Sequence, residues 1–154
     1  MFNELNRFPI FRDLDEKYMD YLKPLFAPYS CHAGEIILQQ GRPADYLYLV
    51  ISGSVEISYK PYDGVSITVS HVEAGGLFGW SAVVGSEKYT SSATAIEDME
   101  AVRIRGSELR KLCVYHPDGG KEILERLASS VSSRWKDAHE QVKFILVQGM
   151  KDNQ

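Results

Sequence analysis

The chain has 154 residues, a formal net charge of -4 and a sequence pI of about 5.6, and 44% of its residues are hydrophobic. This length suits one domain with its own core, and the acidic balance argues against a large nucleic-acid surface, which would need a basic patch. Its short apolar runs and its charged start predict neither a membrane span nor a signal peptide. Cys31 and Cys113 lie far apart with no second pair, which predicts no zinc or redox site and fits a reducing cytoplasm.

The first expected element is a helix within residues 4–27. Asp13, followed three residues later by Glu16, forms a capping-box pattern, and apolar side chains then recur at helical spacing. Pro24 and Pro28 are expected to end this helix. Three apolar side chains are expected to attach the N-terminal segment to the core: Phe8, Ile10 and Phe11.

Between Tyr29 and Arg105 the hydrophobic period changes to two, which is typical of strands. Short strands separated by Gly, Pro and Asp indicate an antiparallel roll or barrel, and the absence of strand–helix alternation excludes a parallel nucleotide-binding sheet. Asp63-Gly64 is the strongest hairpin signal in the chain. The expected strands cover residues 35–38, 46–51, 55–59, 66–72, 92–96 and 101–104.

Helices are expected again after residue 105. Ser107 is expected to cap a short helix over 108–115, and Pro117-Asp118-Gly119-Gly120 to separate it from a long helix over 121–147. The apolar side chains of the long helix alternate in steps of four and three, which is the a/d seam of a coiled coil. The seam consists of Leu124, Ala128, Val131, Trp135, Ala138, Val142 and Ile145.

A helix of this length, about 40 Å at about 1.5 Å per residue, is longer than a roll of this size can cover. Pairing of two copies across a two-fold axis would bury the seam, so we expect a homodimer. The alternative is a helix that packs only on its own roll.

The segment over residues 75–95 contains four glycines and almost no charge. Successive backbone N–H groups in glycine-rich turns can point at one anion. Loops of this length in a compact domain are functional more often than not, so we expect this one to face a ligand. The alternative is a long hairpin connection.

Three turn motifs precede this loop in a fixed order: Ala33-Gly34-Glu35, Gly41-Arg42-Pro43-Ala44-Asp45 and Ser52-Gly53. Together with Phe78-Gly79 and Ala93-Thr94, they resemble the cyclic nucleotide-binding domain, the sensor half of bacterial catabolite-activator-type regulators. Each motif alone is common, and the specificity lies in their order.

The resemblance covers about residues 8–135 and implies a mainly β fold with flanking helices. Its centre would be an antiparallel double-stranded β-helix, a jelly-roll-like β-roll, between an N-terminal helix and a long C-terminal dimerisation helix. We expect residues 1–154 to form one such domain, divided into a helical segment over 1–28, the roll over 29–105 and helices over 106–154.

The resemblance also implies a phosphate-binding cassette in the glycine-rich loop. In the family the cassette begins Phe-Gly-Glu, where the acid takes the ribose 2′-hydroxyl, and an arginine before a small-residue-Ala-Thr run pairs with the cyclic phosphate. Here Trp80 stands in place of the acid and Ser91 in place of the arginine. Charge-assisted hydrogen bonds contribute about 1.5–3 kcal/mol each, so their loss predicts weakened binding of a cyclic nucleotide. The expected ligand-binding residues are Phe78, Gly79, Trp80, Ser81, Ala82, Ser91, Ser92, Ala93 and Thr94.

Several side chains around the loop leave alternatives open. The Trp80 indole could stack on a planar ligand, fill the sugar site or serve only the core. Lys88 could supply a charge, although a solvated lysine is the default. Arg103 and Arg105 alternate along a strand and are expected to face solvent. In the family the long helix touches the base across the dimer, which implies contacts from Ser129, Ser132 or Ser133, with solvent-facing serines as the alternative.

We therefore expect a cytoplasmic, homodimeric small-ligand sensor of the cyclic nucleotide-binding type, without a DNA-binding domain of its own and acting through a partner protein. The resemblance suggests cAMP or cGMP as its ligand. The alternatives are a sensor for another ligand and a dimerisation module with a vestigial pocket. A metal-dependent enzyme on a related roll would need clustered histidines, whereas His32, His71, His116 and His139 are isolated, so we expect no metal site, no catalytic residues and no enzyme.

Overall fold

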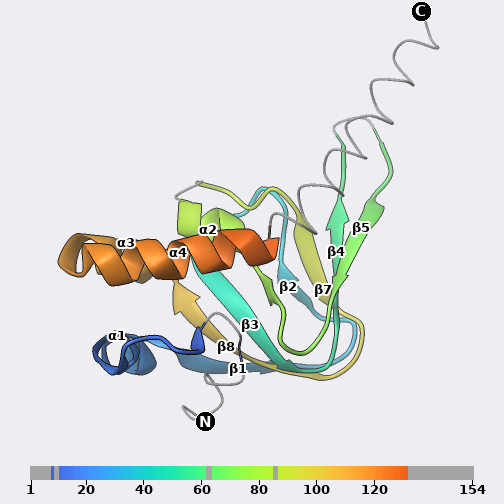
Figure 1. The fold of residues 1–154 in the computed structure, drawn as a ribbon. Coiled ribbons are helices and arrows are strands. Elements are labelled where there is room, and N and C mark those ends of the chain that lie inside the picture. Colours follow the sequence, from blue (N-terminus) through green and yellow to red (C-terminus); the bar gives the residue numbers. More distant parts are fainter. Residues whose placement is uncertain (1–7, 9–10, 62–63, 85–86, 132–154) are drawn as a thin grey trace, which may run out of the picture.

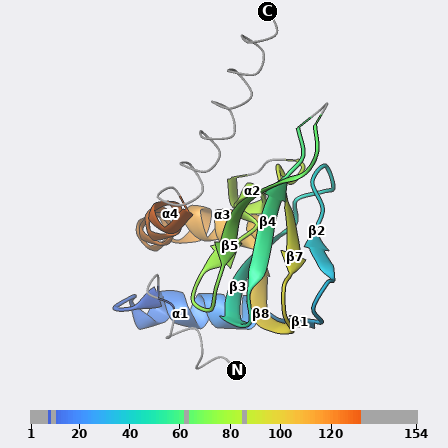
Figure 2. The same cartoon turned by 90° about the vertical axis from the view of Figure 1, so that its right-hand side faces the viewer.

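The computed structural model describes residues 8, 11–61, 64–84 and 87–131. Two four-stranded antiparallel sheets form a roll, with the strand orders β1-β8-β3-β6 and β2-β7-β4-β5 (Figures 1 and 2). The strands are β1 Ala27–Cys31, β2 Ile36–Leu38, β3 Tyr46–Ser52, β4 Val55–Tyr59, β5 Ile67–Val72, β6 Leu77–Phe78, β7 Ser92–Ala95 and β8 Met99–Arg105. The helices are α1 Glu16–Leu22, the short 3-10 helix η3 Lys23–Leu25, α2 Trp80–Val84, α3 Gly106–Tyr115 and α4 Pro117–Val131. The predicted β-roll with flanking helices is thus confirmed.

The alternating pattern of the strands separates two hydrophobic clusters. On β3, Leu47 and Leu49 point out of the roll toward the helices, whereas Tyr48 and Val50 point into it. The outer cluster joins β3, β6 and β8 to α1, α3 and α4, and it includes Phe8 and Phe11, as expected. Ile10 lies outside the described residues. The inner cluster fills the space between the two sheets.

Six strands lie where the period of two predicted them, and two were missed. β1 contains Pro28, which we had expected to end a helix instead. β1 is an edge strand of its sheet, where a proline removes no hydrogen bond from an outer neighbour. β6 has only two residues, too few to show a period. The predicted hairpin is present, since β4 pairs with β5 from Val55↔Val72 to Tyr59↔Ile67, although Asp63 at its tip lies outside the described residues.

The N-terminal helix is shorter than predicted and has a different cap. α1 begins after Asp15, whose carboxylate accepts a hydrogen bond from the Lys17 backbone N–H at 3.1 Å. Asp13, the predicted cap, instead adopts a left-handed backbone conformation with φ of 60°. An aspartate tolerates this conformation better than most residues do, so it serves a turn before the helix.

The predicted cap of α3 is also wrong. The helix begins at Gly106, its N-cap residue is Arg105, and no side chain caps it, so Ser107 lies inside the first turn. Tertiary contacts set this start. The Gly106 N–H donates to the carbonyl of Asp45 at 2.9 Å, and a Cβ at position 106 would overlap the carbonyl oxygen of Ala82.

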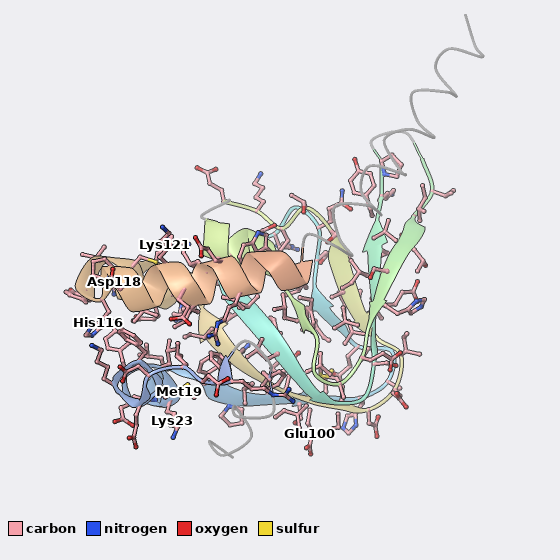
Figure 3. All side chains as sticks on the ribbon, in the orientation of Figure 1. Met19, Lys23, Glu100, His116, Asp118 and Lys121 are labelled. Atoms are coloured by element: carbon pink, nitrogen blue, oxygen red, sulfur yellow. The ribbon has the colours of Figure 1, made fainter. Side chains whose placement is uncertain are left out.

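α4 begins at Pro117, so the segment that we had expected to separate two helices is the first turn of the second one. Proline is well suited to the first position of a helix. Gly119 and Gly120 permit close packing here. A Cβ at Gly119 would lie 2.5 Å from the Tyr18 ring of α1, and one at Gly120 would lie 2.6 Å from Cys113 Cα of α3. This end of α4, marked by Asp118 in Figure 3, therefore sits directly against both helices.

The described part of α4 packs on its own domain. Ile123 and Leu127 are fully buried in the outer cluster, and Leu124, the first residue of the predicted seam, is half-buried beside them. Ala128 and Val131 lie on α4, but their side chains are not described, and the remaining seam residues lie outside the described residues: Trp135, Ala138, Val142 and Ile145. The seam therefore stays a prediction.

No helix among the described residues has both the length and the apolar character that a membrane span requires.

We expect Gly106→Ala to lower the free energy of unfolding by about 1–3 kcal/mol, because the added methyl group overlaps the Ala82 carbonyl and forces α2 and α3 apart. Chemical denaturation measures this. Ser107→Ala is the matched control: it sits next to Gly106 and caps nothing, so it should change stability by less than about 0.5 kcal/mol. A larger loss for Ser107→Ala would restore the capping prediction.

Candidate functional site

The glycine-rich loop forms a strand, a turn and a short helix. β6 ends at Phe78, whose ring stacks parallel on Tyr48 with centroids 4.9 Å apart. Gly79 follows with φ of 91°, and a Cβ there would lie 2.6 Å from the carbonyl oxygen of Tyr46. Only glycine fits both constraints. The turn therefore places Trp80, the first residue of α2, directly at the edge of the roll.

Between α2 and the inner face of the roll lies a cavity of about 60 Å³. Its walls come from Leu38, Ile57, Leu77, Phe78, Gly79, Trp80, Ser81, Tyr89, Thr90 and Ser91. Ligand pockets commonly measure about 300–1,000 Å³. The cavity is therefore closed to a nucleotide in this conformation, and a ligand of that size requires movement of Trp80 or of the segment that carries Ser91.

Five of the nine predicted cassette residues line this cavity: Phe78, Gly79, Trp80, Ser81 and Ser91. The other four do not. Ala82 and Ala93 are buried in the inner cluster. The hydroxyl oxygen of Ser92 accepts the backbone N–H of Gln40 at 2.9 Å. Thr94 lies on β7 opposite Ile36 of β2. The structure thus brings Trp80 and Ser91, the two replacements, to one cavity, and uses the other four positions to build the roll.

The walls of the cavity carry no charge, because every residue that lines it is neutral. Ser81, Thr90 and Ser91 line it and carry hydroxyl groups, as does Tyr89, whose hydroxyl is hydrogen-bonded to the backbone of Tyr46. Lys88 does not reach it: its side chain is exposed, and its backbone forms an isolated bridge with Pro43. A ligand here would meet hydrogen-bond donors and acceptors without a cation.

Trp80 separates the cavity from a second, apolar groove of about 450 Å³ on its other side. The groove is formed by Trp80, Val83, Cys113, Pro117, Lys121, Leu124 and Glu125. The half-buried indole thus borders both the cavity and the groove, and it packs against the outer cluster. A core role and a ligand role are both compatible with this position.

Tyr89 is a site residue that we did not predict. It is buried, and its hydroxyl donates to the carbonyl of Tyr46 at 2.7 Å and accepts from the Tyr46 N–H at 3.0 Å. Burial raises the pKa of Tyr89 to about 12, so the hydroxyl stays protonated at neutral pH. This side chain fixes the segment before Ser91 to β3. Its sequence signal is one aromatic residue within a polar stretch, which is too weak to assign a role.

Arg110 is a second unpredicted residue. From α3 it donates to the carbonyls of Ala82 at 2.5 Å and Val83 at 3.4 Å, at the end of α2. A cation at the C-terminal end of a helix satisfies carbonyls that have no partner inside the helix. Arg110 and Gly106 together couple α3 to α2.

The expectation for Arg103 is wrong. Its side chain is half-buried, with the guanidinium 4.1 Å from the Tyr46 ring centroid and 5.2 Å from that of Tyr29. Arg105 is exposed, as expected, and also lies over Tyr46, at 5.0 Å. Alternation correctly placed both arginines on one face of β8. On that face Arg105 is exposed, whereas Arg103 packs against tyrosine rings.

The expected contacts from the long helix stay untested. Ser129 lies on α4, but its side chain is not described, and Ser132 and Ser133 lie outside the described residues. Within the described ranges, no group of three or more His, Cys, Asp or Glu side chains could hold a metal ion. Burial raises the pKa of the thiols of Cys31 and Cys113, which disfavours the reactive thiolate at neutral pH.

The cyclic nucleotide-binding domain profile matches residues 29–127, which include the roll except for the first two residues of β1, the cassette and α3. The chain belongs to the cyclic nucleotide-binding domain family. It is 28% identical over 124 residues to the CRP-like cAMP-activated global transcriptional regulator of Mycobacterium tuberculosis, a match that covers 80% of this chain and 55% of that protein. The chain thus spans about half the length of this curated relative.

Solved structures of the family share the fold. A candidate cyclic nucleotide-binding protein from Geobacter metallireducens superimposes with a TM-score of 0.76 at 27% identity, over 86% of this chain and 96% of the other. The regulatory subunit of a cAMP-independent protein kinase A from Trypanosoma cruzi, bound to guanosine, superimposes with a TM-score of 0.73 at 18% identity, over 96% and 50%. These relatives are named for binding or regulation, not for catalysis.

We expect Tyr89→Phe to destabilise the fold by about 1–3 kcal/mol, because the change leaves the Tyr46 N–H and carbonyl without the hydroxyl partner that each now has. The midpoint of urea unfolding measures the loss. Tyr115→Phe removes a hydroxyl from an exposed ring and should leave the midpoint unchanged. Equal midpoints for all three proteins would show that Tyr89 does not hold the loop.

Proposed function

We propose that this chain is a regulatory sensor domain whose cassette cavity takes a neutral, planar ligand of the nucleoside type in preference to a cyclic nucleotide. One observation carries the proposal: Trp80 and Ser91, at the positions of the family's acid and arginine, line the same uncharged cavity. The proposed domain acts in signal transduction in the cytoplasm and without enzymatic activity.

The electrostatics of the cavity favour a neutral ligand. A cyclic phosphate carries a full negative charge, and burying a charge without a cationic partner is costly. Hydroxyl groups such as those of Ser81, Thr90 and Ser91 form neutral hydrogen bonds. Such bonds contribute about 0.5–1.5 kcal/mol each, against about 1.5–3 kcal/mol for bonds to a charged group. A nucleoside, which has hydroxyl groups and no phosphate, matches this set of partners without the desolvation penalty.

The aromatic lining also suits a planar ligand. Trp80 presents an indole face and one N–H donor, and Phe78 presents a ring that is already stacked on Tyr48. Trp80 is only half-buried and borders the apolar groove. That groove offers space into which the indole can move when a ligand enters. The Trypanosoma cruzi protein, with the same fold, is bound to guanosine, which makes this nucleoside the first probe to test.

A signal from the cavity has a physical route to α4. Arg110 and Gly106 attach α2 to α3, and Gly120 lets α4 pack against Cys113 of α3. Because Gly106 and Gly120 bring helix backbones close together and the Arg110 side chain binds the Ala82 carbonyl, a displacement of α2 would be transmitted to α3 and α4. We place the homodimer interface on the apolar seam of the long helix, with Ser129, Ser132 and Ser133 as candidate ligand contacts.

A second candidate function is a dimerisation module with a vestigial pocket, acting through a partner protein. The small volume of the cavity, about 60 Å³, favours it. Under this alternative Trp80 replaces the ligand as a core side chain, and no nucleoside or nucleotide binds.

Calorimetric titration separates the candidates. We expect guanosine or adenosine to bind the unmodified protein more tightly than cGMP or cAMP does. At a hundredfold excess over its dissociation constant, a ligand raises the free energy of unfolding by about 2.7 kcal/mol. Absence of binding by every member of this panel would contradict the sensor and favour the vestigial pocket.

A variant that restores the family's arginine and glutamate in the cassette also tests this site. We expect Ser91→Arg combined with Trp80→Glu to increase the affinity for cAMP or cGMP by about tenfold or more, because the arginine pairs with the phosphate. Ser66→Arg combined with Val65→Glu is the matched control, since it adds the same pair of charges on an exposed segment away from the cavity. A gain of equal size for this control would mean that the added charges alone, and not their place in the cassette, are responsible.

The dimer is tested at the seam. We expect Val131→Asp to convert the dimer into a monomer in sedimentation velocity experiments, because it places one charge from each copy in an apolar interface. Lys121→Asp, on the exposed surface of α4, should leave the dimer intact. A persistent Val131→Asp dimer would show that the coiled-coil assignment is wrong.

A further inference from the structure

A second surface of the roll carries positive charge and aromatic rings, away from the cassette cavity. It lies on the inner face of the first sheet, where β3 and β8 pair in the register Tyr46↔Arg105 and Tyr48↔Arg103. Residues directly opposite each other in an antiparallel pair point to the same face. Two tyrosines and two arginines therefore form one continuous surface, to which the Tyr29 ring adds an edge contact with Tyr48 at 5.2 Å.

Within the part of the chain that the structure describes, neither arginine of this surface forms an ion pair with a carboxylate. The ion pairs found there are His32–Asp98, Lys111–Glu108 and Arg126–Glu122. Charges that are removed from solvent normally have partners. Arg103 is half-buried, its guanidinium lies over the rings of Tyr46 and Tyr29, and it donates to the Tyr48 hydroxyl at 3.4 Å.

One polar atom of Arg103 is left without a bond. Its Nε is enclosed by the protein and has no hydrogen-bond partner among the described residues. Unsatisfied enclosed donors are rare and call for a physical explanation, such as an ion or ligand that completes the site. A guanidinium with free donors is the group that best recognises carboxylate and phosphate oxygens.

A polar groove of about 310 Å³ opens beside these tyrosines. It runs between β2 and the start of β3, and its polar walls come from Gln39, Arg42, Asp45, Tyr46, Tyr48 and Tyr89. Its volume falls at the lower end of the range of ligand pockets, about 300–1,000 Å³, and is about five times that of the cassette cavity. Arg42 is exposed and forms no ion pair within the described ranges. Asp45 is the one acidic residue of the walls, and its charge offsets a single arginine.

We infer that this groove is a second ligand site, which binds a small planar anion: an aromatic ring or nucleobase that carries a phosphate or a carboxylate group. The rings of Tyr46 and Tyr48 contact the planar part, and Arg42 pairs with the anionic group. Arg103 and Arg105 do not line the groove, but they lie over the Tyr46 ring and add positive charge beside it. The site is chemically opposite to the neutral cassette cavity, although Leu38 and Tyr89 line both.

The two sites are mechanically connected. Tyr48 lines the groove and stacks on Phe78 of the cassette, and Tyr89 is hydrogen-bonded to the backbone of Tyr46. An anion in the groove would therefore restrain the same side chains that close the cavity. The inference does not depend on which ligand the cavity takes.

Isothermal titration with phenyl phosphate, benzoate and phenol tests the site. We expect at least one of the two anions to bind, with an affinity that falls as salt is raised, and we expect no measurable binding of phenol. Comparison of phenyl phosphate with benzoate shows whether the preferred anion is a phosphate or a carboxylate. Binding of phenol as tight as that of both anions, or binding of none of the three, would overturn the inference.

Single substitutions test whether the anion binds in the groove. Arg103→Gln removes a positive charge beside the groove without removing a lining residue, and should weaken anion binding about twofold to threefold. Arg42→Gln changes an exposed residue, so it keeps the fold and should weaken binding about threefold to tenfold. Lys60→Gln removes the same charge from an exposed side chain outside the groove and should have no effect.

Anion binding in the groove can be distinguished from anion binding in the cassette cavity. Ser91→Ala changes a residue that lines the cavity and not the groove, and should leave the affinity for phenyl phosphate or benzoate unchanged. If Arg42→Gln has no effect while Ser91→Ala weakens anion binding, the anion occupies the cavity and the second site does not exist.

Discussion

The close approach of α2 to the backbone of its neighbours determines the shape of the site. On one side Gly79 passes within 2.6 Å, measured from the position of an added Cβ, of the Tyr46 carbonyl of β3. On the other side Gly106 of α3 lies directly against the Ala82 carbonyl. Arg110 then binds the last carbonyls of α2. The helix is thus held between the roll and α3 by two close backbone approaches and by the Arg110 side chain.

This constraint explains why the cavity is closed and why its opening would matter. With α2 held so closely, Trp80 has the cavity on one side and the apolar groove on the other. A ligand that enters must displace the indole or move α2, which is attached to α3 through Gly106 and Arg110. The energy of binding is then shared between contacts and rearrangement, which lowers the apparent affinity by the fraction of molecules that are open.

The chemistry of the roll shows how one fold can carry different ligand preferences. The family's arginine and acid are absent from the cassette, whereas Arg42 lines the other groove, and Arg103 and Arg105 lie over the ring of Tyr46, which also lines it. An uncharged cavity and a polar aromatic groove, joined through Tyr48 and Phe78, give the domain two chemically distinct surfaces that share one set of rings.

Most of the roll could be predicted from the sequence, because alternation and turn residues report directly on strands that bury one face. Elements too short to show a period were missed: β6 with two residues and α2 with five.

Helix starts were misplaced where tertiary contacts outweigh local signals. Asp15 caps α1 in place of Asp13, and Gly106 begins α3 because only glycine fits there. The cassette was located from its motif, and the lack of charge at Trp80 and Ser91 was evident. The roles of Tyr89, Arg103 and Arg110 were not, because each depends on partners more than 25 residues away.

The most direct test of the account is a crystal structure of the protein grown with guanosine and cGMP at equal concentrations. The account predicts electron density for the nucleoside between α2 and the inner face of the roll, against a displaced Trp80 and within hydrogen-bond distance of Ser91. Density for a cyclic phosphate beside Ser91, with Trp80 in its present position, would contradict it.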